Sequence, residues 1–244
     1  MDEFQARATI FRFDPTSGQP SRYEQFELPV TKNMRVLDVL RSIYETQAGD
    51  LAFQYACRVG RCGTCAVIVN GRPVLACQER VKPKMKIEPL SPFPVLRDLI
   101  IDYSEAEKRY SDLNLAPIAA GGSTAPAQDA RGRATFAPDH AREVGLMGSC
   151  LACMVCVSAC PAVKERAFDG PAYMLQLRRL SEHPADHGAR LEQALDGGLL
   201  ECFSCGACAE VCPADLSPAD AIRDFRREML LGQKRHKHSN GEDS

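Results

Sequence analysis

The cysteines are the residues whose type and spacing could do chemistry, and all twelve fall into three groups. In the first group, four residues and then two separate the first three cysteines, and eleven more precede the fourth. This C-x4-C-x2-C opening is the plant-type spacing for a 2Fe-2S cluster. A loop can wrap thiolates around a cluster only where the backbone turns sharply, which Gly60 and Gly63 permit. The predicted ligands are Cys57, Cys62, Cys65 and Cys77.

A structural zinc site is the alternative for this first group. Zinc knuckles rarely place four residues between their first two thiolates, so the spacing favours an iron–sulfur cluster. Cys77 ends a predicted hairpin, from which it can fold back as the fourth ligand.

The second and third groups are near-copies of each other, and both read C-x2-C-x2-C-x3-C-P. This run is typical of bacterial ferredoxins, and in two-cluster proteins its fourth cysteine ligates the other cluster. Two zinc sites are the alternative, but zinc has no need of a duplicated run with trailing prolines. The predicted 4Fe-4S ligands are Cys150, Cys153, Cys156 and Cys212, and the predicted ligands of the third cluster are Cys160, Cys202, Cys205 and Cys208.

Composition restricts the class of partner and the compartment. Thirty basic and thirty-two acidic residues give a formal charge of -2, so no global field draws the chain to nucleic acid. No apolar stretch has the length of a membrane span, and the first residues lack the features of a signal peptide. A reducing compartment is therefore expected, where metal ligation is favoured over disulfides. No nucleophile–base pair stands out, so no catalytic residue is predicted.

The elements that must position the first group are strands and one helix. Residues 7–13 and 23–30 are rich in aromatic and β-branched residues and predict a hairpin. Apolar residues at helical spacing predict a helix over 36–44. Asn70-Gly71 predicts a second, tight hairpin, and a strand at 85–88 is expected to be the last strand of this region.

Further along the chain the strand signals vanish. Apolar spacing predicts a helix over 171–183, and Ser217 followed by Pro218 is a favourable start for another. A run of small, polar, Pro and Gly residues separates the two halves and predicts a linker. The predicted organisation is a first domain at 1–110, a linker at 111–139, a helical domain at 140–232 and a disordered tail at 233–244.

The order of the three groups, their gap lengths and their trailing prolines resemble the iron–sulfur subunit of the succinate dehydrogenase and fumarate reductase family. The resemblance covers roughly residues 6–232. It implies an α+β chain, with an N-terminal β-grasp plant-type 2Fe-2S ferredoxin domain followed by an α-helical bacterial-type two-cluster ferredoxin domain.

The resemblance also implies an electron path. Electrons would pass between an FAD-containing flavoprotein, which interconverts succinate and fumarate, and a quinone at a membrane anchor with or without haem. The chain would be the non-catalytic electron-transfer subunit. It would lie on the cytoplasmic side of the inner membrane, attached through its partner subunits.

Two departures from the family pattern concern the acceptor end. In most of the family the third cluster is 3Fe-4S, because a residue that cannot ligate iron replaces the second cysteine of the last run. Here that residue is Cys205, which predicts a 4Fe-4S cluster, with 3Fe-4S as the alternative. The chain has no Trp, and Phe203 follows Cys202 where relatives often place a His. The expected quinone-side wall residues are Pro161, Ala162 and Phe203.

Two other functions stay open. One is a soluble iron–sulfur adaptor of another flavoprotein dehydrogenase or reductase, without a quinone site. Cys205 and the absent Trp favour it, whereas the length argues against a thiol-dependent fumarate reductase. The other is a zinc-stapled interaction module, which iron and acid-labile sulfide in the purified protein would exclude.

Overall fold

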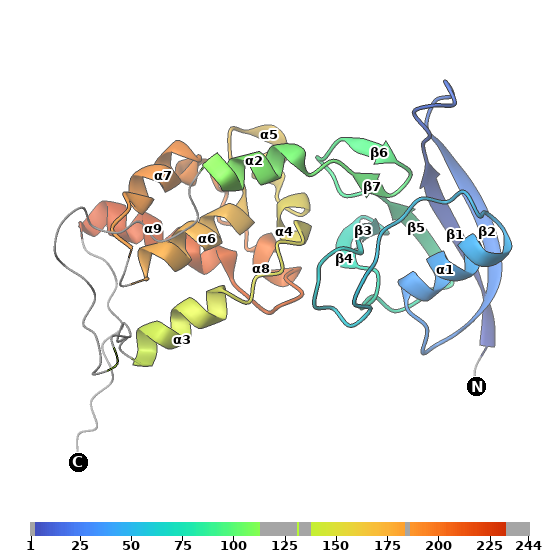
Figure 1. Ribbon diagram of the computed structural model, residues 1–244, viewed down its shortest axis with the longest axis horizontal. Coiled ribbons are helices and arrows are strands. Elements are labelled where there is room, and N and C mark those ends of the chain that lie inside the picture. Colours follow the sequence, from blue (N-terminus) through green and yellow to red (C-terminus); the bar gives the residue numbers. More distant parts are fainter. Residues whose placement is uncertain (1–2, 113–130, 132–137, 184–185, 233–244) are drawn as a thin grey trace, which may run out of the picture. The chain divides into compact units, whose positions relative to one another are not determined.

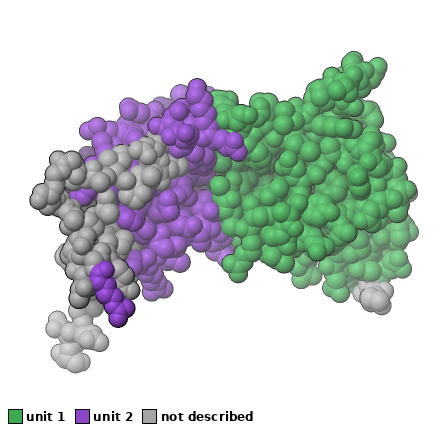
Figure 2. Space-filling view, viewed as in Figure 1, with its two compact units in different colours: residues 1–105, 151–159, 211–213 green, residues 106–150, 160–210, 214–244 purple. Residues whose placement is uncertain are grey.

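The computed structural model describes residues 3–112, 131, 138–183 and 186–232, which group into two compact units (Figure 2). The predicted tail and nearly all of the predicted linker lie outside these described residues. Unit 1 comprises residues 1–105, 151–159 and 211–213, and unit 2 comprises residues 106–150, 160–210 and 214–244.

Unit 1 is built on a mixed sheet with the strand order β2-β1-β5-β3-β4 (Figure 1). The predicted first hairpin is confirmed, since β1 (Glu3–Arg12) and β2 (Arg22–Thr31) pair antiparallel. At the centre of the sheet, β1 runs parallel to β5 (Lys84–Glu88).

The second predicted hairpin is also confirmed. It joins β3 (Ala66–Val69) to β4 (Arg72–Leu75). Asn70 and Gly71 form its turn with φ values of 51° and 81°, the left-handed pair that a tight hairpin turn requires.

The predicted amphipathic helix is α1 (Val36–Thr46), which packs against β2 and buries one apolar face. Its first turn is held where the Arg35 N–H donates to the Asp38 carboxylate at 2.8 Å. The buried residues of this face are Val36, Leu37, Val39, Leu40 and Ile43.

The expectation that β5 closes the strand region was wrong. Two short strands follow it, β6 (Val95–Arg97) and β7 (Ile100–Ile101), and they pair antiparallel. Their connection is fixed by Asp98, which is 2% exposed. Its carboxylate accepts the Phe13 N–H and the Ala52 N–H, both at 2.8 Å, and pairs with Arg12 at 3.1 Å.

Unit 2 is helical, and its described residues contain no strand. The two predicted helices are confirmed as α6 (Pro171–Ser181) and α9 (Pro218–Leu231). Ser217 caps α9, since its hydroxyl accepts the Asp220 N–H at 3.2 Å. No helix among the described residues is long and apolar enough to cross a membrane. The helices that follow the last strand are α2 (Ser104–Asp112), α3 (Pro138–Met147), α4 (Val155–Ser158, in unit 1), α5 (Pro161–Glu165), α6 (Pro171–Ser181), α7 (Arg190–Asp196), α8 (Ala207–Glu210) and α9 (Pro218–Leu231), with a 3-10 turn at Leu199–Glu201.

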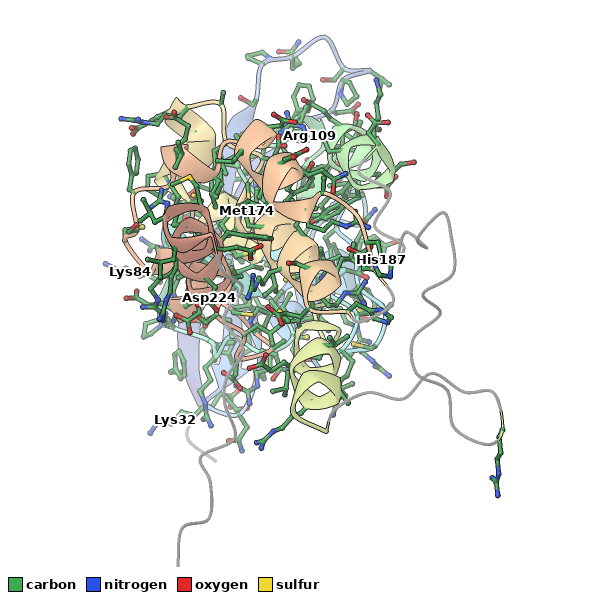
Figure 3. All side chains as sticks on the ribbon, turned by 90° about the vertical axis from the view of Figure 1, so that its left-hand side faces the viewer. Lys32, Lys84, Arg109, Met174, His187 and Asp224 are labelled. Atoms are coloured by element: carbon green, nitrogen blue, oxygen red, sulfur yellow. The ribbon has the colours of Figure 1, made fainter. Side chains whose placement is uncertain are left out.

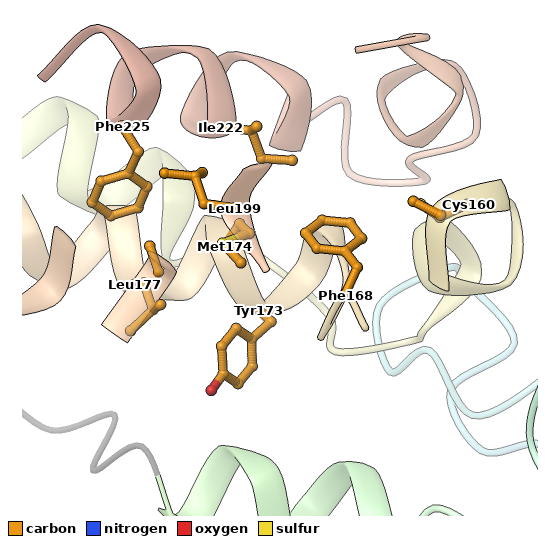
Figure 4. Packing of buried hydrophobic residues seen from close by; sticks show 10 residues of the cluster. Cys160, Phe168, Tyr173, Met174, Leu177, Leu199, Ile222 and Phe225 are labelled. Atoms are coloured by element: carbon orange, nitrogen blue, oxygen red, sulfur yellow. The ribbon is translucent and has the colours of Figure 1, made fainter. Parts of the chain in front are cut away.

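The core of unit 2 is formed mainly where α6 packs against α9. Met174 of α6 (Figure 3) is fully buried there, and Phe225 points into the same cluster from α9 (Figure 4). Tyr173 belongs to the same cluster, but its hydroxyl points out of it (Figure 4). Cys160 is also a member, so one of the predicted ligands is anchored directly in the core. The α+β order expected for the chain is confirmed.

Candidate iron–sulfur cluster sites

The first cysteine group lies on a loop of unit 1 that precedes β3. Gly60 and Gly63 have φ values of 72° and 76°, so both glycines make the left-handed turns for which the sequence suggested them. The backbone N–H groups of Val59 and Arg61 donate to the Cys57 sulfur at 3.5 and 3.2 Å. Such N–H···S bonds stabilise a thiolate and tune a cluster bound to it.

Cys77 follows β4 and returns to this loop. The Ala76 N–H donates to the Cys65 carbonyl at 3.0 Å, which ties the two segments together. Cys65 and Cys77 are both buried. Burial raises the pKa of Cys65 to about 12, whereas a hydrogen bond from the Thr64 hydroxyl is the largest effect lowering the pKa of Cys62 to about 6. A buried thiol of this kind loses its proton when it binds a metal, because the cation neutralises the charge of the thiolate.

Most of the predicted 4Fe-4S ligand set lies in unit 1. Cys153, Cys156 and Cys212 all belong to segments of this unit, whereas Cys150 is assigned to unit 2. Cys156 is held in α4, every residue of which is buried. Helix α4 packs against β4, so this cysteine is positioned by the sheet that also precedes Cys77.

The predicted ligands of the third cluster line a cavity of about 380 Å³ in unit 2. Cys160 approaches it from the start of α5, and the others come from the loop and helix of the last run. The structure therefore brings together the fourth cysteine of one run and the first three of the other. The four thiols that line the cavity are those of Cys160, Cys202, Cys205 and Cys208.

These four thiols differ in exposure. Burial raises the pKa of Cys208 to about 11, and the neighbouring thiolates of Cys160, Cys202 and Cys205 add to the effect. Burial likewise raises the pKa of Cys160. Cys205, by contrast, is exposed. Four thiols on the wall of one cavity supply the donor atoms that an iron–sulfur cluster needs.

The expected quinone-side residues line the same cavity. Ala162 is buried in the core, whereas Phe203 is 41% exposed. The guanidinium of Arg166 lies 4.8 Å from the centre of the Phe203 ring, so the apolar wall has a cation at its edge.

Arg226 on α9 is a site residue that the sequence patterns did not reveal. Arg226 lines the cavity of the third ligand set. Its guanidinium donates to the carbonyls of Leu199, Leu200 and Cys202 and to the Ser204 hydroxyl. The sequence signal for Arg226 is its position four residues after the buried Ile222, which places its charge on the inner side of α9.

Models of two protein families match the chain. Residues 7–108 match a 2Fe-2S iron–sulfur cluster binding domain, and residues 147–216 match a 4Fe-4S dicluster domain. Both cluster-binding domains expected from the cysteine spacing are therefore present.

Similar proteins cover most of the chain. The fumarate reductase iron–sulfur subunit of Haemophilus influenzae is 32% identical over 90% of this chain and 91% of its own length. That of Mycobacterium tuberculosis is 30% identical over 89% and 90%. A fumarate reductase (CoM/CoB) subunit of Methanothermobacter marburgensis is 34% identical over 89% of this chain, which spans only 43% of that relative's length.

A solved structure has the same fold over nearly the full length. A chain of the Mycobacterium smegmatis Sdh1 complex superposes with a TM-score of 0.81 and 26% identity, covering 95% of this chain and 99% of that one. Together with the sequence relatives, this match confirms the family suggested by the cysteine pattern. The chain belongs to the family of iron–sulfur subunits of fumarate reductases and succinate dehydrogenases.

Proposed function

We propose that the chain passes electrons between an FAD-containing flavoprotein and a quinone at a membrane anchor, through a 2Fe-2S cluster, a 4Fe-4S cluster and a third cluster. It would do so as the non-catalytic subunit of a succinate:quinone or quinol:fumarate oxidoreductase. It would be held through its partners on the cytoplasmic side of the inner membrane. The clusters supply one-electron carriers when bound, and the protein supplies ligands, burial and hydrogen bonds.

The ligand sets are those that the cysteine spacing predicts. The first set is supported by the loop of unit 1 in which two N–H groups donate to the Cys57 sulfur. The second set rests mainly on spacing, with Cys156 fixed in α4. The proposed sets are Cys57, Cys62, Cys65 and Cys77 for 2Fe-2S, Cys150, Cys153, Cys156 and Cys212 for 4Fe-4S, and Cys160, Cys202, Cys205 and Cys208 for the third cluster.

One observation carries the proposal of three clusters rather than two. The four thiols of the third set line a single cavity, although Cys160 comes from a different run from the others. A fourth thiol at Cys205 supports a 4Fe-4S cluster there, because a 3Fe-4S cluster needs only three thiolates. Pro161, Ala162 and Phe203 would form the wall of the third site on its quinone side.

Electron paramagnetic resonance of the anaerobically purified chain tests the third cluster. The native chain should show no full-occupancy 3Fe-4S signal on mild oxidation, and Cys205→Ala should create one. Cys153→Ala, at the equivalent position of the other run, should leave the third cluster unchanged. A stoichiometric 3Fe-4S signal in the native chain would overturn the 4Fe-4S assignment, and a two-cluster iron content would overturn the third cluster itself.

A quinone-free adaptor is the second candidate. The similarity to a subunit of a fumarate reductase (CoM/CoB), together with the fourth thiol at Cys205, favours it. Affinity purification of the tagged chain from gently solubilised membranes separates the two functions. A membrane anchor and quinone reductase activity in the purified complex support the first, and a complex with neither supports the adaptor.

A further inference from the structure

Gly63, in the loop of the first cysteine group, has no room for a side chain. Its φ of 76° is left-handed and the residue is buried. A methyl group built on it would lie 2.7 Å from Cβ of Cys153 and 3.0 Å from the carbonyl oxygen of Leu151. Both neighbours belong to the same compact unit as Gly63. The loop of the first group therefore touches the backbone that carries Cys153, a predicted ligand of the second cluster.

The Cys153 side of this contact is held in an uncommon backbone conformation. Ala152 and Met154, on either side of it, have φ values of 49° and 60°, which non-glycine residues seldom adopt. Such conformations persist only where the surrounding structure imposes them. Here the following helix α4 is wholly buried and packs against β4, so the segment is anchored in unit 1.

We infer that Gly63 is a positioning residue for electron transfer, which sets the gap between the 2Fe-2S cluster and the cluster bound by Cys153. The inference rests on the proposed function. The rate of electron tunnelling falls steeply as the gap widens, so a residue that forces the two loops apart slows the exchange. Because glycine adds no side-chain atom, it permits the shortest gap, and any larger residue must push the loops apart.

Gly63→Ala in the cluster-loaded full chain tests this role. The readout is the magnetic interaction between the two reduced clusters, measured as the enhanced spin relaxation of the 2Fe-2S signal. We expect a several-fold weaker relaxation enhancement and a slower electron exchange. The matched control is Gly71→Ala, since Gly71 has a similar φ of 81° but no atom within 4 Å of a built methyl group. It carries the same backbone strain and should keep the native interaction.

A second variant covers the case in which Gly63→Ala fails to hold both clusters. Gly63→Ala combined with Ala152→Gly relaxes the left-handed residue opposite, so the segment can yield to the new methyl group. An unchanged interaction in either variant would overturn the inference. So would loss of the clusters from both variants, since Gly63 would then serve assembly rather than spacing. Failure of the proposed function is distinct, because the native chain itself would then show no interaction between two clusters.

Discussion

Replacing Arg226 by methionine should loosen the third cysteine site selectively. The substitution keeps an apolar stem of similar length but removes the guanidinium. That group makes its shortest bonds, 2.7 Å each, to the Cys202 carbonyl and the Ser204 hydroxyl, and it reaches the Leu199 carbonyl at 2.9 Å. The loop before Cys205 would lose its attachment to α9.

The magnitude follows from these contacts. A hydrogen bond from a charged donor contributes about 1.5–3 kcal/mol where it is buried. Arg226 is only half-buried, and all of its bonds come from one guanidinium. We therefore expect Arg226→Met to lower the free energy of unfolding by roughly 2–3 kcal/mol. Arg223 on the same helix is the matched control. Its side chain is 72% exposed and pairs with the exposed Asp220, so Arg223→Met should change stability by less than about 0.5 kcal/mol.

The assay is the thermal loss of each cluster, followed by its own paramagnetic signal. In Arg226→Met the signal of the third cluster should disappear at a lower temperature, while the 2Fe-2S signal persists as in the native chain. Equal sensitivity of Arg226→Met and Arg223→Met would refute the reasoning. So would simultaneous loss of the 2Fe-2S signal, because that cluster is predicted to bind in unit 1.

Three further outcomes are expected in unit 2. Phe225→Ala, at the fully buried centre of the core, should lower the free energy of unfolding by about 3–5 kcal/mol in urea titrations, whereas the exposed Leu230→Ala should leave it almost unchanged. Gly198→Ala should abolish folding detectable by circular dichroism, since φ is 82° and the new methyl group would overlap a backbone carbonyl. Burial, with the charge of Asp169, raises the pKa of Tyr173 above its ordinary value of about 10. The Tyr173 hydroxyl therefore contributes fully to stability below about pH 10, and this contribution is lost as the pH rises further. In alkaline unfolding titrations the native chain should accordingly lose stability relative to Tyr173→Phe.

The sheet and the long helices were predictable because their signals are local. Asn70-Gly71 marks a turn whatever surrounds it, and the apolar spacing of α1 and α6 needs no distant partner. The cysteine spacing was equally informative, since gap lengths alone identified both cluster-binding domains.

What could not be predicted depends on contacts between residues far apart in the chain. Strands β6 and β7 are short, and Asp98 between them is held by Arg12, Phe13 and Ala52. No periodicity in residues 95–101 signals this arrangement. The close approach of Gly63 to Cys153 is likewise invisible in the sequence, where the glycine indicates only a turn.

The membership of unit 1 has a consequence for synthesis on the ribosome. Strand β4 emerges long before α4, the helix that packs against it, and residues 211–213 of the same unit emerge later still. Domains otherwise tend to fold as they leave the ribosome, N-terminal part first. The surface of β4 that contacts α4 therefore stays uncovered until that helix has been synthesised. A chain stalled before residue 151 would present that surface to chaperones and proteases.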